Sequence, residues 1–249
     1  MSHAVQSRTN TGSLVLPISP AAASRRTPRA PAIAITRERQ GDLCRALNVV
    51  IAAIALIVLL PLMLLIALAI KLTSRGPVLF RQTRIGIDRR RPGPHNLLWR
   101  RTVDHGGKPF TMYKFRTMRH APTVLAVWAA KDDPRITPVG RFLRRHRLDE
   151  LPQLVNVLKG EMNIVGPRPE QPEIFQDLRR QIRQYDVRQR VLPGITGLAQ
   201  VSQPYDQSVD DVRRKLIFDL EYIRQRSPLQ DLRIMMRTMP VMFGRKWGW

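Results

Sequence analysis

The chain has 249 residues, enough for one medium-sized domain with appendages. Its 42 Lys and Arg residues against 19 Asp and Glu give a formal net charge of +23, which indicates a polyanionic partner: nucleic acid, an anionic bilayer or phosphorylated substrates. The only cysteine is Cys44, so an intramolecular disulfide and a zinc site built on cysteines are excluded.

Residues 1–40 form the first predicted region. They are rich in Ser, Thr, Ala, Pro and Arg and show little apolar periodicity, which is typical of a disordered basic arm. The apolar run at residues 15–18 is too short for a secretory signal peptide. We therefore expect an unstructured tail without chemistry.

An uncharged apolar segment follows at residues 46–70, where Asn48 is the one polar side chain. As a straight helix it would be about 37 Å long, more than the roughly 30 Å of a bilayer's hydrocarbon core. We predict a membrane helix within residues 41–72. Because basic residues near a membrane gain energy from anionic lipid, membrane lipid is a better default partner than nucleic acid.

Two features of this segment favour a re-entrant helix over a spanning one. Pro61 lies inside it, where it removes a backbone hydrogen bond and kinks or breaks the helix. The flanks on both sides are strongly basic, although a spanning helix usually has its basic residues on one side. We expect both ends to lie on the cytoplasmic face, and a spanning helix is the alternative.

The remaining residues, 73–249, read as one cytoplasmic domain. Residues 77–80 and 112–116 are predicted to be short strands, and the Pro- and Gly-containing stretch 92–107 a loop or hairpin connection. Apolar spacing predicts a helix from about Asp149 to a stop at Gly160. Further helices are predicted at 170–190, 209–224 and 229–243, with a turn at 192–197. The predicted fold class is helix-rich α+β with amphipathic helices on the membrane surface.

The most informative polar feature is the adjacent pair Asp149 and Glu150, which lies among arginines and upstream of Arg168. Carboxylates can supply a nucleophile and a cation ligand, while arginine recognises phosphate through its planar fork of donors. The predicted helix start would place the pair at the positive end of a helix dipole, where phosphate also binds. The pattern therefore indicates phosphate chemistry.

Seven motifs in this order make the chain similar to a known family: QTRIG at 82–86, YKFRTM at 113–118, DPRITPVG at 133–140, LDELPQL at 148–154, NVLKG at 156–160, VGPRP at 165–169 and PGITG at 193–197. Together they resemble the bacterial sugar transferases, the monotopic phosphoglycosyl transferases that begin cell-surface glycan assembly on a polyprenyl phosphate. The resemblance covers roughly residues 43–244. It implies a re-entrant membrane helix in the bacterial inner membrane and a catalytic domain on the cytoplasmic face.

The resemblance also implies roles for individual residues. Asp149 corresponds to the nucleophile that attacks a UDP-sugar and carries the sugar phosphate until polyprenyl phosphate takes it. Glu150 corresponds to the residue that would hold Mg²⁺. Candidates for phosphate or substrate contacts are Lys114, Arg116, Arg144, Arg168 and, more weakly, Asp219. Asn48 departs from the family, which commonly has an acidic residue near the start of the membrane helix.

Two alternatives remain open at this point. A membrane-tethered basic adaptor would need only the basic surface, and its acidic pair would be a structural helix cap. Few aromatic residues accompany the basic ones for base stacking, which argues against a nucleic-acid adaptor. An inactive member of the family would keep the fold and lose the chemistry. The sequence does not reveal the sugar, the carrier length, the downstream glycan or the oligomeric state.

Overall fold

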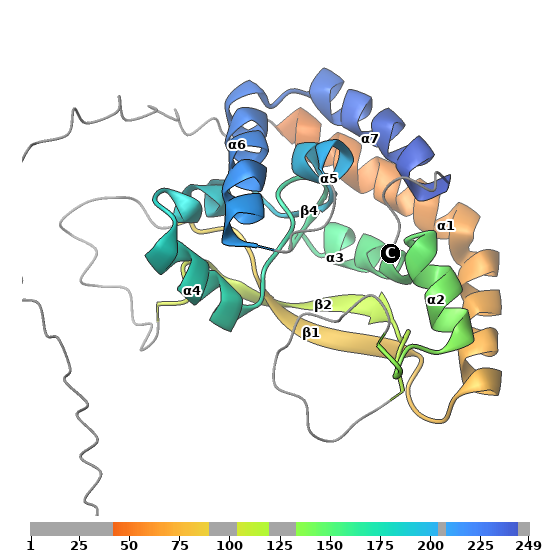
Figure 1. Cartoon of the computed structure of the whole chain (residues 1–249). Helices are drawn as coiled ribbons and strands as arrows, with labels where there is room; N and C mark the ends of the chain where they lie inside the picture. The colour runs from red at the N-terminus through yellow and green to blue at the C-terminus, as the bar shows by residue number, and fades with distance from the viewer. Residues whose placement is uncertain (1–41, 90–103, 120–132, 204–207, 244–249) are drawn as a thin grey trace, which may run out of the picture. The chain divides into compact units, whose positions relative to one another are not determined.

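The computed structural model describes residues 42–89, 104–119, 133–203 and 208–243 (Figure 1). The predicted basic arm lies outside these residues, and its boundary stays a prediction. Helices dominate the described part, together with two short two-stranded sheets, so the predicted helix-rich α+β class is confirmed.

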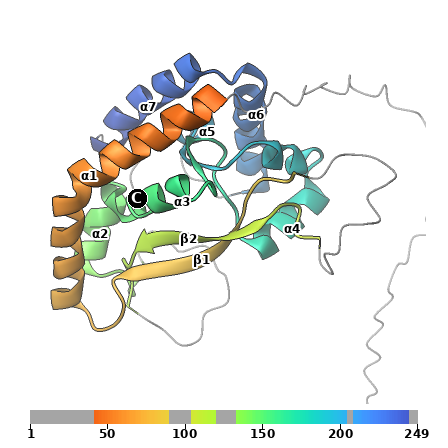
Figure 2. The same cartoon turned by 180° about the vertical axis from the view of Figure 1, so that it is seen from behind.

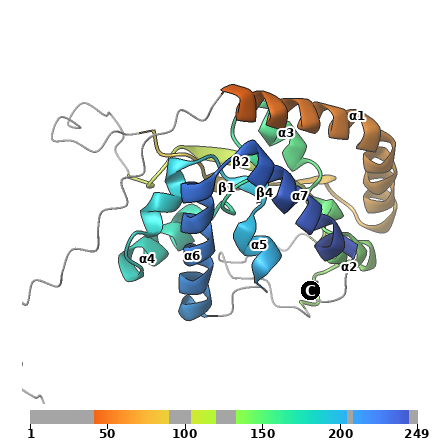
Figure 3. The same cartoon turned by 90° about the horizontal axis from the view of Figure 1, so that it is seen from above.

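The predicted apolar segment forms helix α1, Asp42–Thr73, which is long and apolar enough to cross a membrane. Helical backbone continues through Pro61, and Figures 2 and 3 show that α1 is bent into two arms. A proline inside a helix is a common cause of such a bend, because its ring clashes with the preceding turn and it cannot donate a hydrogen bond. The predicted break is therefore a bend within one helix.

One face of α1 packs on the rest of the described chain along both arms. In the first arm, Ala52 is buried against Phe110, Leu154 and Met162, and in the second, Ile66 and Ile70 are buried with Phe115 and Leu143. The opposite face exposes large apolar side chains, namely Leu43, Val50, Ile54, Ile57, Val58, Leu60, Leu62, Leu64, Leu65, Leu68 and Leu72. Exposed apolar area of this extent indicates contact with lipid.

The two predicted strands are present and longer than expected. Strand β1, Leu79–Ile85, pairs antiparallel with β2, Pro109–Phe115, and Phe80 lies opposite Lys114 in this register. The predicted connection between them lies partly outside the described residues. Apolar residues of β2 face the core, where Phe110 and Met112 contribute to the cluster beneath α1.

Helix α2, Pro138–Arg145, leads into a 3-10 turn, η2, Leu148–Glu150, and then into helix α3, Gln153–Leu158. The prediction that a helix begins near Asp149 is therefore wrong by about four residues. Pro152 has no N–H to donate to the carbonyl four residues earlier, so α-helical bonding starts only after it. The predicted stop is confirmed, since Gly160 has a φ of +80° just beyond the helix end.

The predicted helix over residues 170–190 is broken. Helix α4, Pro172–Gln181, ends where Ile182 turns extended, and a 3-10 helix, η3, Tyr185–Arg190, follows Gln184 at a positive φ. This break allows both Tyr185 and Arg188 to be buried. In a continuous helix, Tyr185 and Arg188 would share one face, and the direction of that face would be set by α4. The break frees η3 from this constraint.

The predicted turn at residues 192–197 contains strand β4, Gly194–Thr196, which pairs parallel with β3, Asn163–Val165. Helix α5, Leu198–Ser202, follows. The last two predicted helices are confirmed as α6, Val209–Gln225, and α7, Pro228–Phe243. Ser208 caps α6 through a capping box with Asp211.

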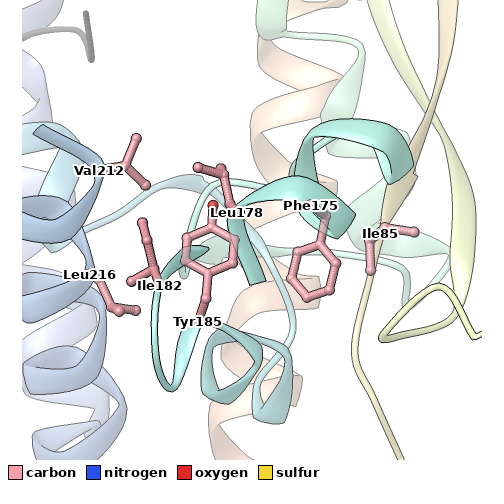
Figure 4. Packing of buried hydrophobic residues seen from close by; sticks show 7 residues of the cluster. All are labelled: Ile85, Phe175, Leu178, Ile182, Tyr185, Val212 and Leu216. Carbon is pink, nitrogen blue, oxygen red and sulfur yellow. The ribbon is translucent and has the colours of Figure 1, made fainter. Parts of the chain in front are cut away.

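Figure 4 shows a third apolar cluster, which joins elements far apart in sequence. It contains one residue of β1, three residues of α4 and its C-terminal cap, one of η3 and two of α6: Ile85, Phe175, Leu178, Ile182, Tyr185, Val212 and Leu216. The cluster fixes α4, η3 and α6 against strand β1. Elements η3 and α6 also carry charged residues of the candidate site described below.

Candidate active site

The acidic pair is buried in turn η2, between α2 and α3 and against strand β2. Asp149 is 8% exposed and Glu150 is 5% exposed. Arg147, just before the turn, has a positive φ of 54°, an unusual conformation for a residue other than glycine. The tight turn places both carboxylates inside the domain, where their charges need compensation.

Glu150 is held by two cations from different elements. The Lys114 ammonium, on β2, donates to Glu150 Oε1 at 2.8 Å. The Arg168 guanidinium donates from Nη2 to Oε1 at 2.6 Å and from Nη1 to Oε2 at 3.4 Å. Both oxygens of Glu150 are thus engaged, and three residues that the sequence predicted to share a site are in direct contact.

Asp149 differs from its neighbour. Within the described residues, its carboxylate makes no hydrogen bond or ion pair. Arg144, on α2, is close enough for its charge to act on Asp149, and it donates from Nε to the Thr117 hydroxyl at 2.9 Å. The structure therefore places the predicted nucleophile in a positive environment without neutralising it in a salt bridge.

The pKa values of the two carboxyl groups are shifted in opposite directions. Burial raises the pKa of Asp149 above its usual range, against the charges of Lys114, Arg168 and Arg144. Burial also acts to raise the pKa of Glu150, but the charges of Arg168 and Lys114 outweigh it and hold that pKa well below its usual range. Such divergence between adjacent acids is a feature of sites with distinct chemical roles.

A second layer of charge supports Arg168. The fully buried guanidinium of Arg188 donates to the Arg168 backbone carbonyl at 3.0 Å and to Asp219 Oδ2 at 2.7 Å. Asp219 was predicted as a weak substrate contact, but the structure places it 2% exposed and paired with Arg188. Burial raises the pKa of Asp219, while the Arg188 charge opposes that rise. Asp219 therefore reaches the acidic pair only through Arg188 and Arg168.

Glu170 completes this second layer. Its carboxylate lies 3.5 Å from Lys215 and 3.6 Å from Arg188, and Arg84 approaches it at 3.9 Å. Burial would raise the pKa of Glu170, but the charges of these three residues lower it to about 2. Arg84 also donates to the Pro169 carbonyl at 3.0 Å. The loop that carries Arg168 is therefore fixed by cations on both sides.

The structure gives Arg116 a position different from the one its predicted role suggests. Its guanidinium is buried and donates to the Ser74 and Arg75 carbonyls at 2.8 and 2.9 Å, at the C-terminal end of α1. These two carbonyls lie just beyond Thr73, the last residue of α1, and Arg116 satisfies them. Its contact with substrate phosphate stays a prediction. The hydrogen bonds show that Arg116 anchors the chain at the end of α1.

The supporting residues Arg188, Glu170 and Lys215 were not predicted. Arg84 and Glu170 had a weak signal, since one lies in the QTRIG motif and the other directly follows the VGPRP motif. Arg188 had none, because one arginine among 42 basic residues carries no local sign of burial. Within the described residues, no group of three or more His, Cys, Asp or Glu side chains is placed to hold a metal ion.

A helix long and apolar enough to cross a membrane, a small α+β domain and an acidic pair held by cations define the class of this protein. A family model described as "Bacterial sugar transferase" matches residues 40–245, and the chain belongs to this family. The resemblance inferred from the seven motifs is therefore confirmed.

Curated relatives agree with the family. The chain is 42% identical over 198 residues to a UDP-glucose:undecaprenyl-phosphate glucose-1-phosphate transferase of Escherichia coli, covering 78% of this chain and 39% of that protein. A protein of the same name from Caulobacter vibrioides is 42% identical over 201 residues, covering 79% and 68%. An Aeromonas hydrophila relative, 39% identical over 196 residues, is named for UDP-N-acetylgalactosamine and covers 78% and 42%. The chain thus spans about two fifths of the E. coli and Aeromonas proteins.

Proposed function

We propose that this protein transfers a sugar 1-phosphate from a UDP-sugar to undecaprenyl or a related polyprenyl phosphate, through a covalent intermediate on Asp149. The names of its relatives support the reaction, because they couple a UDP-sugar with undecaprenyl phosphate. The observation that carries the residue assignment is the contrast within the acidic pair: Glu150 is held by Lys114 and Arg168, and Asp149 is not.

In the first step, an oxygen of the Asp149 carboxylate attacks the β-phosphorus of the UDP-sugar. The bond between that phosphorus and the oxygen bridging to the α-phosphate breaks, and UMP leaves with the bridging oxygen. A desolvated carboxylate with a raised pKa is a better nucleophile than a solvated one. Lys114, Arg144 and Arg168 surround the site with positive charge, which stabilises charge on the transferred phosphoryl group.

In the second step, a phosphate oxygen of the polyprenyl phosphate attacks the same phosphorus. The acyl-phosphate bond to Asp149 breaks, the free carboxylate is regenerated, and the product is a polyprenyl diphosphate sugar. Each step exchanges one phosphorus–oxygen bond for another, so no oxidant or reductant is needed. This order explains why Asp149 has to be left out of the salt bridges that hold Glu150.

We also propose that Mg²⁺ takes part. Asp149 and Glu150 are adjacent carboxylates, and Mg²⁺ is commonly bound by one or two carboxylates together with substrate phosphates. Such a site needs no third acidic side chain, and carboxylate oxygens that accept hydrogen bonds retain further lone pairs. Glu150, with Asp149 beside it, would hold the ion, which would neutralise charge on the diphosphate.

The packing of α1 supports a re-entrant membrane helix. Near its first end, Arg45 donates to the carbonyls of Met162 and Val157, and at its last end Arg116 binds the Ser74 and Arg75 carbonyls. Both ends therefore contact the same domain, as a helix that enters and leaves one leaflet requires. A spanning helix would carry one end to the opposite side. We propose that the domain lies on the cytoplasmic face of the bacterial inner membrane.

The test is the mass of the intact protein after incubation with candidate UDP-sugars and Mg²⁺, without lipid acceptor. The expected result is a mass increase of one sugar phosphate in the wild type and none in Asp149→Asn. Addition of polyprenyl phosphate should discharge the adduct. Absence of an adduct with every sugar, together with absence of UMP release when acceptor is present, would overturn the proposal in favour of an adaptor or an inactive enzyme.

A further inference from the structure

Strand β3 is bound to the membrane helix by a side chain. Ile164, in the middle of β3, donates its backbone N–H to Asn48 Oδ1 at 2.9 Å, and Asn48 is completely buried within α1. The Asn48 amide also donates to the Cys44 carbonyl at 2.7 Å, one turn earlier in the helix. Asn48 thus fixes the position of β3 relative to the first arm of α1, 116 residues away in sequence.

Two further helices meet β3 at the same place. The Tyr222 hydroxyl, on α6, lies 3.1 Å from the Val165 carbonyl and 2.9 Å from Asp231 Oδ1, on α7. Asp231 is completely buried and is also in contact with the Asn48 side chain. We call Asn48, Tyr222 and Asp231, together with the β3 backbone that they bind, the Asn48 cluster. Among the described residues, Arg226 is a cation whose charge acts to lower the pKa of both Tyr222 and Asp231.

Strand β3 leads directly to the residue that holds the acidic pair. Only residues 165–167 separate Ile164 from Arg168, and they are fixed by backbone bonds from Gly166 to Thr196 and from Gly194 to the Pro167 carbonyl. Arg168 then binds both oxygens of Glu150. A shift of β3 along its axis would therefore move Arg168, since this short connection has no slack.

We propose that Asn48 is a positioning residue of the active site, which sets Arg168 against Glu150 by fixing β3 to the membrane helix. This inference rests on the proposed function and adds a purpose for the one polar residue of the apolar segment 46–70. Arg168 then lies in its correct position beside Glu150 only while the first arm of α1 is packed on the domain. Asn48 touches no reacting atom and acts through β3.

The experiment uses the full chain in lipid nanodiscs and follows adduct formation in a single turnover. The test variants are Asn48→Ala, Asn48→Asp and the exchange Asn48→Asp with Asp231→Asn. The single Asp variant places two carboxyl groups against each other in a buried space, whereas the exchange restores one amide and one carboxyl group. Val212→Ala is the matched control, because it weakens the buried packing of α6 in the cluster of Figure 4 and belongs neither to the Asn48 cluster nor to the packing around turn η2.

Adduct formation has two readouts, the amplitude and the rate constant. A merely structural role would lower the amplitude, which reports the folded fraction, and leave the rate constant unchanged, as expected for Val212→Ala. We expect Asn48→Ala to lower the rate constant about tenfold, the size expected when a buried N–H loses its partner. Asn48→Asp should be slowed similarly, and the exchange should return the rate constant to within about threefold of wild type.

Rate constants for both Asn48 single variants equal to that of Val212→Ala would overturn the inference, as would an exchange variant no faster than Asn48→Asp. These outcomes are distinct from failure of the proposed function. That failure would appear as the absence of any adduct in the wild type, whereas this test requires a wild-type adduct and compares how fast it forms.

Discussion

Glu150 and Asp149 are adjacent in turn η2 and both are buried, yet Lys114 and Arg168 bind only Glu150. The two carboxylates therefore make opposite contributions to the fold. Glu150 forms ion pairs with two partly buried cations, Lys114 and Arg168, while the Asp149 charge is buried without an ion pair among the described residues. A site that keeps a desolvated nucleophile ready is expected to be less stable than one without it.

This difference predicts that the two isosteric amide variants change stability in opposite directions. Asp149→Asn removes an uncompensated buried charge and should raise the free energy of unfolding by about 1–2 kcal/mol at pH 7. Glu150→Gln removes the anion that Lys114 and Arg168 share and should lower it by about 3 kcal/mol. Thermal unfolding in detergent measures both. Destabilisation by both variants would contradict the assignment of roles.

The same contrast predicts a pH dependence. The folded pKa of Asp149 is raised, so its ionisation opposes folding as pH rises through that pKa, and below its usual value of 3.8 the group is neutral in both states. The advantage of Asp149→Asn should therefore vanish in acid. The folded pKa of Glu150 is depressed, so its contribution is present above its usual value of 4.5 and is lost as pH falls through the folded pKa. Unfolding curves of the three proteins from pH 7 down to about pH 2.5 measure these trends, because both losses fall below the usual pKa values of the two groups.

Arg168 is predicted to act by geometry as well as charge. Its two terminal nitrogens contact both Glu150 oxygens, a fork that lysine cannot reproduce. Arg168→Ala should slow adduct formation about 100-fold, and Arg168→Lys by about tenfold. Arg180→Ala is the control, because it removes an exposed arginine paired with Asp177. Equal rates for Arg168→Lys and wild type would show that a point charge is sufficient.

Elements governed by local pattern were predictable from the sequence. Helices α6 and α7 and the apolar helix α1 follow their periodicity or length, and the motifs placed Lys114, Glu150 and Arg168 in one site, although not the ion pairs between them. The three-residue strands β3 and β4 were missed because each is too short for an alternating pattern and β4 lies in a Pro- and Gly-containing stretch.

Tertiary burial explains the other differences. The stretch 170–190 has helical composition, but burial of Tyr185 and Arg188 requires a break before η3. Arg116 lies in a motif shared with Lys114, but it follows the last residue of β2. The sequence cannot show that these two neighbouring cations serve different elements: Lys114 reaches Glu150, while Arg116 reaches the end of α1. Contacts between residues far apart in sequence decide these placements.

Asp219 is predicted to stabilise the site from a distance. Asp219→Ala removes the principal anion of buried Arg188 and should lower the free energy of unfolding by about 3–5 kcal/mol. The matched control is Asp210→Ala on the same helix, because Asp210 pairs with Arg213 at an exposed surface and should cost less than about 1 kcal/mol. Chemical denaturation compares the two. Similar losses for both would contradict a buried structural role for Asp219.

Helix α7 is predicted to lie on the membrane surface. It exposes Leu229, Leu232, Met236 and Met239, while Ile234 on its other face is buried. An apolar face of this kind favours insertion into the headgroup boundary. In a Cys44→Ser background, a nitroxide label at position 236 should be accessible to oxygen in the bilayer, and a label at exposed Ile217 on α6 to a water-soluble relaxation agent. The same accessibility at both positions would remove α7 from the membrane face.

The proposed re-entrant geometry of α1 predicts that both of its ends are reached from one side of the membrane. Leu43 and Arg75 are exposed at opposite ends, and Cys44 is the only cysteine, so Cys44→Ser provides a clean background. A membrane-impermeant maleimide should label Leu43→Cys and Arg75→Cys equally in inside-out vesicles, and neither in intact spheroplasts. A spanning helix would expose one of the two cysteines in each preparation. Labelling of Ile217→Cys locates the catalytic domain in the same experiment, because that residue lies on the exposed surface of α6.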